Sequence, residues 1–96
     1  AHGIRVVLCS VLPISDYTPR KQSERRPPAD ILRLNAWLKD YAAKAKAVYA
    51  DYYRATVDEK GFLREGISGD GLHPNDRGYE LMKTVVAAAI EQARRN

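Results

Sequence analysis

The chain begins with a nearly continuous apolar segment, residues 4–12, that is rich in β-branched side chains. An apolar run of this length without polar alternation is typical of a strand buried on both faces of a parallel sheet. Pro13 follows directly, and we expect the strand to end there because proline cannot donate a ladder hydrogen bond. The pattern therefore begins with a buried parallel strand.

A helix is predicted after a long polar connection, residues 13–28. Connections of this length inside a compact domain are often functional. Pro28 and Asp30 are start signals for the helix, and we expect Trp37 to widen its apolar stripe within the core. The stripe itself repeats every three or four positions: Ile31, Leu34, Leu38, Tyr41, Ala42 and Ala45.

The pattern changes again over residues 47–53, where β-branched and aromatic side chains predict a second short strand. The residues that carry this prediction are Val48, Tyr49, Tyr52 and Tyr53. The alternative is that the helix continues through the alanines. Glycines punctuate residues 56–69, which predicts a loop with a few apolar anchors.

A final helix is predicted from Asn75 onward, with Asp76 near its start and Arg94 and Arg95 at its end, as the helix dipole favours. The order strand, helix, strand, loop, helix is that of an α/β fold with a parallel pair and a right-handed crossover. Two strands leave both sheet edges open, so we expect an incomplete architecture. The apolar positions of this helix are Tyr79, Met82, Val85, Val86, Ala89 and Ala93.

Composition excludes several classes of protein. With 45% hydrophobic residues, the chain is too apolar to be disordered, and its apolar runs are too short to span a bilayer. Cys9 is single, so the chain has no internal disulfide and no cysteine cluster for a metal, and we expect no cofactor. The net charge of +4 comes partly from the terminal arginines and from one loop that contains Arg20, Lys21, Arg25 and Arg26. Solvated surface charge explains this excess better than nucleic-acid binding does.

Asp70 and His73 are the candidate catalytic residues, three positions apart where a glycine-bearing loop meets the last helix. A carboxylate beside a histidine fixes the imidazole tautomer and stabilises its protonated form. The histidine can then act as a general base and afterwards as a general acid. Pro74 restricts the backbone of His73 to extended conformations and prepares the turn into the helix.

The segment Asp70-Gly71-Leu72-His73-Pro74-Asn75-Asp76-Arg77-Gly78-Tyr79 closely resembles the last conserved block of the SGNH, or GDSL, serine hydrolases. Residues 4–13, 35–38 and 49–53 are similar to that family's fourth strand, next helix and fifth strand. The nearest kin by this resemblance are small bacterial acylhydrolases grouped with platelet-activating-factor acetylhydrolase-like esterases. The resemblance implies that residues 1–96 are the C-terminal βαβα portion of a flavodoxin-like, three-layer α/β/α domain.

By the same resemblance, His73 is the base and Asp70 its orienting partner in a Ser-His-Asp triad that hydrolyses acetyl or short-chain acyl esters. The Gly-Asp-Ser block of the nucleophile and the Gly-x-Asn-Asp block of the oxyanion hole do not occur in the 96 residues. The expected partners are a small ester and the N-terminal part of the hydrolase, and we expect the chain alone to be inactive.

Three serines lie near the expected site, Ser10, Ser15 and Ser68, and none has the glycine neighbours of a nucleophile elbow. We interpret them as ordinary strand-end and loop residues. The alternative hypothesis is a non-catalytic α/β fragment that self-associates into a homo-oligomer to complete its sheet. A further alternative is that the connection 13–28 lines the substrate mouth, with Arg20, Arg25 or Arg26 near an anionic group, but a solvated loop is the favoured interpretation. Binding of nucleic acid through the same loop has only charge in its favour. The sequence does not assign a compartment.

Overall fold

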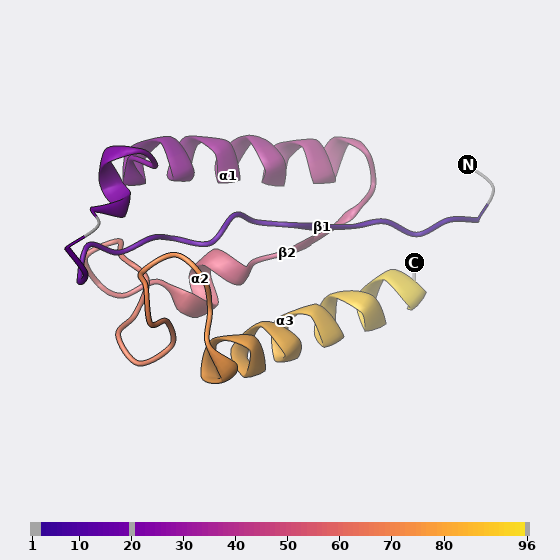
Figure 1. The fold of residues 1–96 in the computed structure, drawn as a ribbon. Helices are drawn as coiled ribbons and strands as arrows, with labels where there is room; N and C mark the ends of the chain where they lie inside the picture. Colours follow the sequence, from indigo (N-terminus) through magenta and orange to yellow (C-terminus); the bar gives the residue numbers. More distant parts are fainter. Residues whose placement is uncertain (1–2, 20, 96) are drawn as a thin grey trace.

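The computed structural model describes residues 3–19 and 21–95, which form two short strands and three α-helices (Figure 1). A 3-10 turn, Gln22–Glu24, interrupts the long connection before the first helix. The elements follow in the order β1 (Val7–Cys9), α1 (Pro28–Lys44), β2 (Val48–Ala50), α2 (Tyr52–Thr56) and α3 (Asp76–Arg95).

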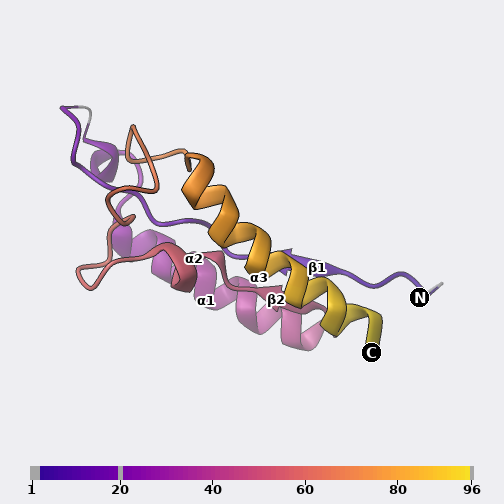
Figure 2. The ribbon, with the colours of Figure 1, turned by 90° about the horizontal axis from the view of Figure 1, so that it is seen from below.

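The fold is α/β, with β1 and β2 paired in parallel between two layers of helix. Val7 is opposite Val48 and Cys9 is opposite Ala50. Helix α1 covers one face of the pair and α3 covers the other, as the two views together show (Figures 1 and 2). Because the strands are parallel, their carboxyl ends meet at one end of the molecule, where α2 and the long loops also gather. The predicted α/β class and parallel pairing are confirmed.

The core is built from small side chains between β2 and α3. Val48 and Ala50 are buried against Ala89 and Ala93, with Val85 packed beside them. Alanines at these positions let the helix approach the strand closely, and the three- and four-residue spacing predicted this face correctly. Tyr79, which the same spacing placed on the buried face, lies outside it and is 56% exposed.

The first strand is shorter and more exposed than predicted. Only Val7–Cys9 form the strand, whereas Ile4 and Val6 before it are 73% and 54% exposed. The pairing partner β2 is itself three residues long, and within the described chain β1 is paired along one edge only. An apolar run predicts that a strand is buried, but the length of the strand depends on the length of the strand with which it pairs.

The second strand was predicted to include Tyr52 and Tyr53, and this is wrong because both residues begin the short helix α2. The carboxylate of Asp51 accepts a hydrogen bond from the backbone N–H of Arg54 at 3.0 Å, which caps the helix. The backbone N–H of Tyr53 donates to Ser10 Oγ at 2.8 Å. These capping interactions explain why the chain turns into a helix despite two β-favouring tyrosines.

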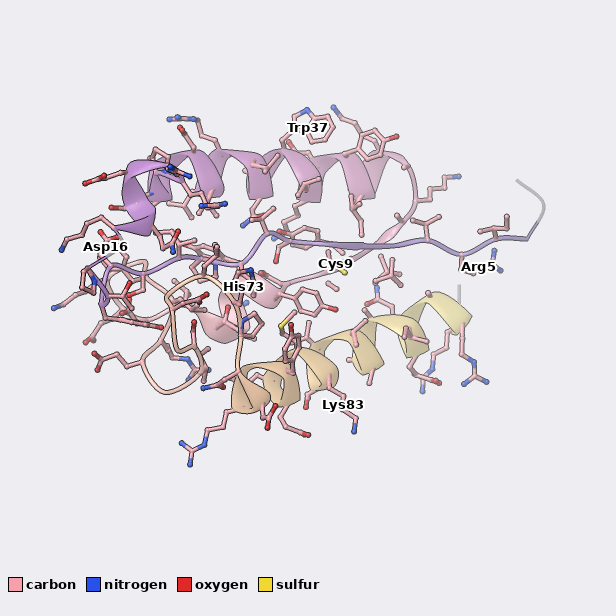
Figure 3. All side chains as sticks on the ribbon, in the orientation of Figure 1. Arg5, Cys9, Asp16, Trp37, His73 and Lys83 are labelled. Carbon is pink, nitrogen blue, oxygen red and sulfur yellow. The ribbon has the colours of Figure 1, made fainter. Side chains whose placement is uncertain are left out.

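Helix α1 begins at Pro28, close to the predicted start, and buries only part of the expected stripe. Ile31 and Ala42 are buried as predicted, whereas Leu34 and Tyr41 are 45% and 52% exposed. Its buried residues are Ile31, Asn35 and Ala42, whereas Trp37 is 60% exposed and stacks on Tyr41 with ring centroids 5.3 Å apart. At about 100° per residue, position 37 lies about 200° around the helix from Asn35. Trp37 therefore points away from the strands, and its predicted place in the core is wrong (Figure 3).

The basic residues lie on the surface, as the charge pattern suggested. Lys21, Arg25 and Arg26 are exposed, and Arg20 lies outside the described residues. Arg94 and Arg95 both pair with Glu91, at 3.1 and 3.3 Å. In residues 3–19 and 21–95, none of the helices has the length and apolar character needed to cross a membrane.

Candidate active site

Asp70 and His73 are in direct contact in the loop that leads into α3. This loop lies at the end of the molecule where the strands point, and His73 is labelled there in Figure 3. Nδ1 of His73 lies 2.7 Å from Oδ2 of Asp70. The two side chains remain open to solvent, 73% exposed for His73 and 52% for Asp70. The sequence spacing therefore corresponds to a formed acid–base pair at the surface of the described chain.

The second carboxylate oxygen of Asp70 fixes the backbone of the same turn. Oδ1 accepts hydrogen bonds from the backbone N–H groups of Leu72, at 2.8 Å, and His73, at 2.7 Å. The hydrogen bond to the His73 side chain is the main cause that lowers the pKa of Asp70 far below its usual value, and these two backbone donors lower it further. The carboxylate is thus ionised at neutral pH and bonds both the ring Nδ1 and the backbone N–H of His73.

This geometry defines which nitrogen of His73 is free to react. A carboxylate only accepts hydrogen bonds, so Nδ1 carries the proton when the imidazole is neutral. Nε2 then has a free lone pair, and the imidazolium formed on protonation is stabilised by Asp70. The arrangement suits a general base that later returns its proton as a general acid.

Ser68 stabilises the backbone of the loop that carries this pair. Its hydroxyl is buried, donates to the backbone carbonyl of His73 at 2.6 Å and accepts from the N–H of Gly71 at 3.0 Å. From the sequence we expected an ordinary loop residue here, and this supporting role was missed. Its position two residues before Asp70 in a glycine-bearing loop was the available signal, because serine hydroxyls often bond to nearby backbone groups in turns.

Gly71 attaches the loop to the segment that follows β1. The backbone N–H of Ser15 donates to the carbonyl of Gly71 at 2.8 Å. Gly71 has a φ of +80°, and a Cβ built on it would lie 2.6 Å from the Ser15 carbonyl oxygen. Only glycine combines this backbone conformation with this close approach.

Asn75 joins the loop to the start of α3. Its side-chain oxygen accepts from the N–H of Gly78 at 3.1 Å, and its side-chain amide donates to the carbonyl of Gly66 at 3.0 Å. A Cβ on Gly78 would lie 2.7 Å from the carbonyl oxygen of Ile67, so the first helical turn packs directly on the loop backbone. The Asn-x-x-Gly part of the motif is thus a helix cap and a close packing contact.

The other two serines near the site have structural partners. Ser10 is buried, and its hydroxyl accepts the backbone N–H of Tyr53 at 2.8 Å. Ser15 is buried and bonded through its backbone to Gly71. These partners agree with the interpretation of both serines as strand-end residues.

A groove of about 530 Å³ begins at His73 and runs between the segment after β1 and the start of α1. Its walls are mainly apolar, from Leu12, Pro13, Ile31 and Leu72. From the sequence, a lining role for the connection 13–28 was only the less favoured alternative, because the groove depends on how residues 11–14 and 25–34 fold against the loop that contains Asp70 and His73. The placement makes it a candidate for substrate binding.

The chain is similar in sequence and in fold to known hydrolases. The sequence model of the GDSL-like lipase/acylhydrolase family matches residues 1–81. A Bacteroides fragilis protein assigned as an acylhydrolase has a crystal structure that matches with a TM-score of 0.80 and 33% identity. A GDSL-like lipase from Bacteroides thetaiotaomicron matches with a TM-score of 0.77 and 35% identity. The esterase domain of the ZfL2-1 ORF1 protein from a zebrafish retrotransposon shares the fold, with a TM-score of 0.69 and 24% identity.

These matches cover nearly all of the chain but less than half of each neighbour. In the order given, the structures cover 93%, 94% and 96% of this chain, and this chain covers 43%, 44% and 49% of them. No protein of curated function matched the chain. The family match extends through the Asp70–His73 loop and the first turn of α3, where the motif lies. The chain belongs to the GDSL-like lipase/acylhydrolase family.

Proposed function

We propose that this chain supplies the general base and its orienting acid for a serine ester hydrolase. The observation that carries the proposal is the 2.7 Å contact between His73 Nδ1 and Asp70 Oδ2, in a member of an acylhydrolase family. The carboxylate leaves Nε2 of His73 unprotonated and exposed to a reacting group. The substrate is a small carboxylic ester with an acetyl or other short acyl group.

The reaction needs a nucleophile that we place outside these 96 residues. A serine hydroxyl attacks the ester carbonyl while His73 Nε2 removes its proton, and the tetrahedral intermediate then expels the alcohol, which takes that proton. Water repeats the sequence on the acyl-enzyme and releases the acid. Throughout, Asp70 remains ionised beside the imidazolium. We accordingly assign residues 1–96 to the C-terminal portion of a single hydrolase domain, whose N-terminal portion is the partner.

A chimeric enzyme tests this proposal. The segment of the Bacteroides thetaiotaomicron GDSL-like lipase that this chain matches is replaced by residues 1–96, and hydrolysis of p-nitrophenyl acetate is measured. We expect the chimera to hydrolyse the ester and His73→Ala to reduce kcat by at least about a thousandfold, as removal of a triad member does.

Lys83→Ala is the matched control, because Lys83 is exposed on α3 and points away from the sheet (Figure 3). It should leave kcat unchanged. Circular dichroism establishes that each chimera is folded, and the unaltered lipase gives the reference rate. A folded chimera without activity beside an active reference, or one whose activity survives His73→Ala, would contradict the proposal.

A second candidate function is self-association without catalysis. One observation favours it: in the described chain β1 is paired on one edge only, and the apolar residues Ile4 and Val6 before it are exposed. An open edge of this kind recruits another strand. Light scattering of the purified chain decides the matter, since a stable dimer of the 96-residue chain supports self-association and a monomer excludes it.

A further inference from the structure

The groove beside His73 has a basic wall as well as an apolar one. Arg25 and Arg26 line it together with Leu72 and His73. A second hollow of about 430 Å³ lies against the same two arginines and Leu72, and both Lys21 and the acidic Glu24 border it. The cations therefore flank Leu72 at the edge of the groove, within the space that leads to the proposed base.

These two arginines are not neutralised within the described chain. Neither forms an ion pair with any residue of the ranges 3–19 and 21–95, and the guanidinium of Arg26 donates only to the side chain of Gln22, at 3.3 Å. Asp30 is the acidic residue that lines the groove, and its carboxylate is already paired with Arg33. An anion in the groove would thus meet two available guanidinium groups.

The apolar walls of the groove favour a ligand that also has a hydrocarbon segment. Leu12, Leu34 and Leu72 line the same groove, are not buried, and offer carbon surface beside the arginines and His73. A neutral polar molecule would leave the guanidinium groups without a partner, and a small inorganic anion would leave the carbon surface uncovered. A molecule with a short hydrocarbon segment that ends in an anionic group satisfies both.

We propose that this site acts on esters that carry an anionic group, held by Arg25 and Arg26, at the end of a short apolar segment lying along the groove. This inference rests on the proposed ester hydrolysis and adds the class of substrate. The shared chemistry of the anion is a carboxylate, phosphate or sulfate that can accept two guanidinium hydrogen bonds.

Binding to the 96-residue chain tests the inference without any need for turnover. Monoethyl adipate and ethyl hexanoate have the same chain length and differ by a terminal carboxylate in place of a methyl group. In a titration followed by ¹H–¹⁵N NMR, we expect monoethyl adipate to bind about fivefold more tightly, the scale of an exposed ion pair. The shifts should be concentrated at Arg25, Arg26, Leu72 and His73.

Two variants with the same loss of charge make the test specific. Arg25→Gln/Arg26→Gln should abolish the preference for monoethyl adipate, whereas Arg94→Gln/Arg95→Gln, at the far end of α3, should retain it. Monoethyl sulfate and monoethyl phosphate as competitors distinguish the kinds of anion. Equal affinity for the two esters, no binding of either, or a preference that survives Arg25→Gln/Arg26→Gln would overturn the inference.

The chimeric enzyme separates this inference from the proposed function. Hydrolysis of ethyl hexanoate reports on ester hydrolysis alone, and the ratio of kcat/KM for the two esters reports on the arginines. A chimera that hydrolyses ethyl hexanoate with no preference for monoethyl adipate would overturn only the anionic substrate class. An inactive chimera would overturn the hydrolase assignment and with it the ester substrate, whereas the binding titration would still show whether Arg25 and Arg26 select an anionic group.

Discussion

Replacing Gly71 by alanine tests whether the loop that contains Asp70 and His73 is held against the segment after β1. The new Cβ would lie 2.6 Å from the carbonyl oxygen of Ser15, a distance that real Cβ contacts do not adopt. Gly71 also has a φ of +80°, which L-residues with a side chain rarely adopt. The loop must therefore move, and the hydrogen bond from Ser15 N–H to the Gly71 carbonyl is the first interaction lost.

The expected loss of stability has two parts. A side chain in the left-handed region costs about 1–2 kcal/mol. Loss of the hydrogen bond to the buried Ser15 adds about 1–3 kcal/mol, because its N–H is left without a partner. Gly71→Ala should thus lower the free energy of unfolding by about 3 kcal/mol.

Gly61→Ala is the matched control. Gly61 has a φ of +90°, but a Cβ added to it would have no heavy atom within 4 Å, so the alanine meets backbone strain without a clash. Its expected loss is about 1 kcal/mol. The effect of either alanine on the unfolded chain is the same and cancels in the comparison.

Urea unfolding followed by circular dichroism measures both variants on the 96-residue chain. We expect Gly71→Ala to be the more destabilising by about 2 kcal/mol, or to prevent folding where Gly61→Ala does not. We also expect the amide resonances of Asp70 and His73 to shift only in Gly71→Ala. Equal losses in the two variants would refute the close approach between the loop and Ser15.

Three further predictions concern the rest of the chain. Asn35 is buried and its side chain bonds both the N–H and the carbonyl of Val11, at 2.7 and 2.9 Å. In urea unfolding, Asn35→Ala should lower the free energy of unfolding by about 2 kcal/mol, and replacement of the exposed Trp37 by alanine should lower it by less than about 1 kcal/mol. The pKa of Asp70 is lowered on folding, so the ionised carboxylate stabilises the fold fully above the unfolded pKa of 3.8, and this stabilisation is lost as the pH falls below that value. Asp70→Asn should therefore flatten the decline of the thermal midpoint between about pH 5 and pH 2. The 96-residue chain alone should show no hydrolysis of p-nitrophenyl acetate that His73→Ala abolishes, and such an activity would contradict the absence of a nucleophile.

Patterns that depend on local spacing predicted the structure well. The apolar period in α3 placed Val85, Ala89 and Ala93 on the buried face, and Asp70 and His73 are close enough in sequence for one turn to bring them together. The family match also agrees with the resemblance read from the motif. Such features are visible in a sequence because the residues that share a helix face or a turn are close along the chain.

The misplaced residues have partners that are distant in sequence. Asn35 occupies the buried stripe of α1 because it bonds Val11, 24 positions away, and this turns Trp37 outward. Tyr53 lies in a helix, and its backbone N–H donates a hydrogen bond to the hydroxyl of Ser10, 43 positions away. No periodicity of apolar residues contains these tertiary hydrogen bonds, so Trp37 was assigned to the core and Tyr53 to a strand.

The tautomer of His73 tests the central claim most directly. The chain contains two histidines, so ¹⁵N-labelling of histidine gives a simple spectrum in which the two nitrogens of each ring can be assigned. At a pH where the imidazole is neutral, we predict that His73 carries its proton on Nδ1, bonded to Asp70, and that Asp70→Asn changes this tautomer. A proton on Nε2, with the same spectrum in Asp70→Asn, would show that Asp70 does not orient His73 as a base.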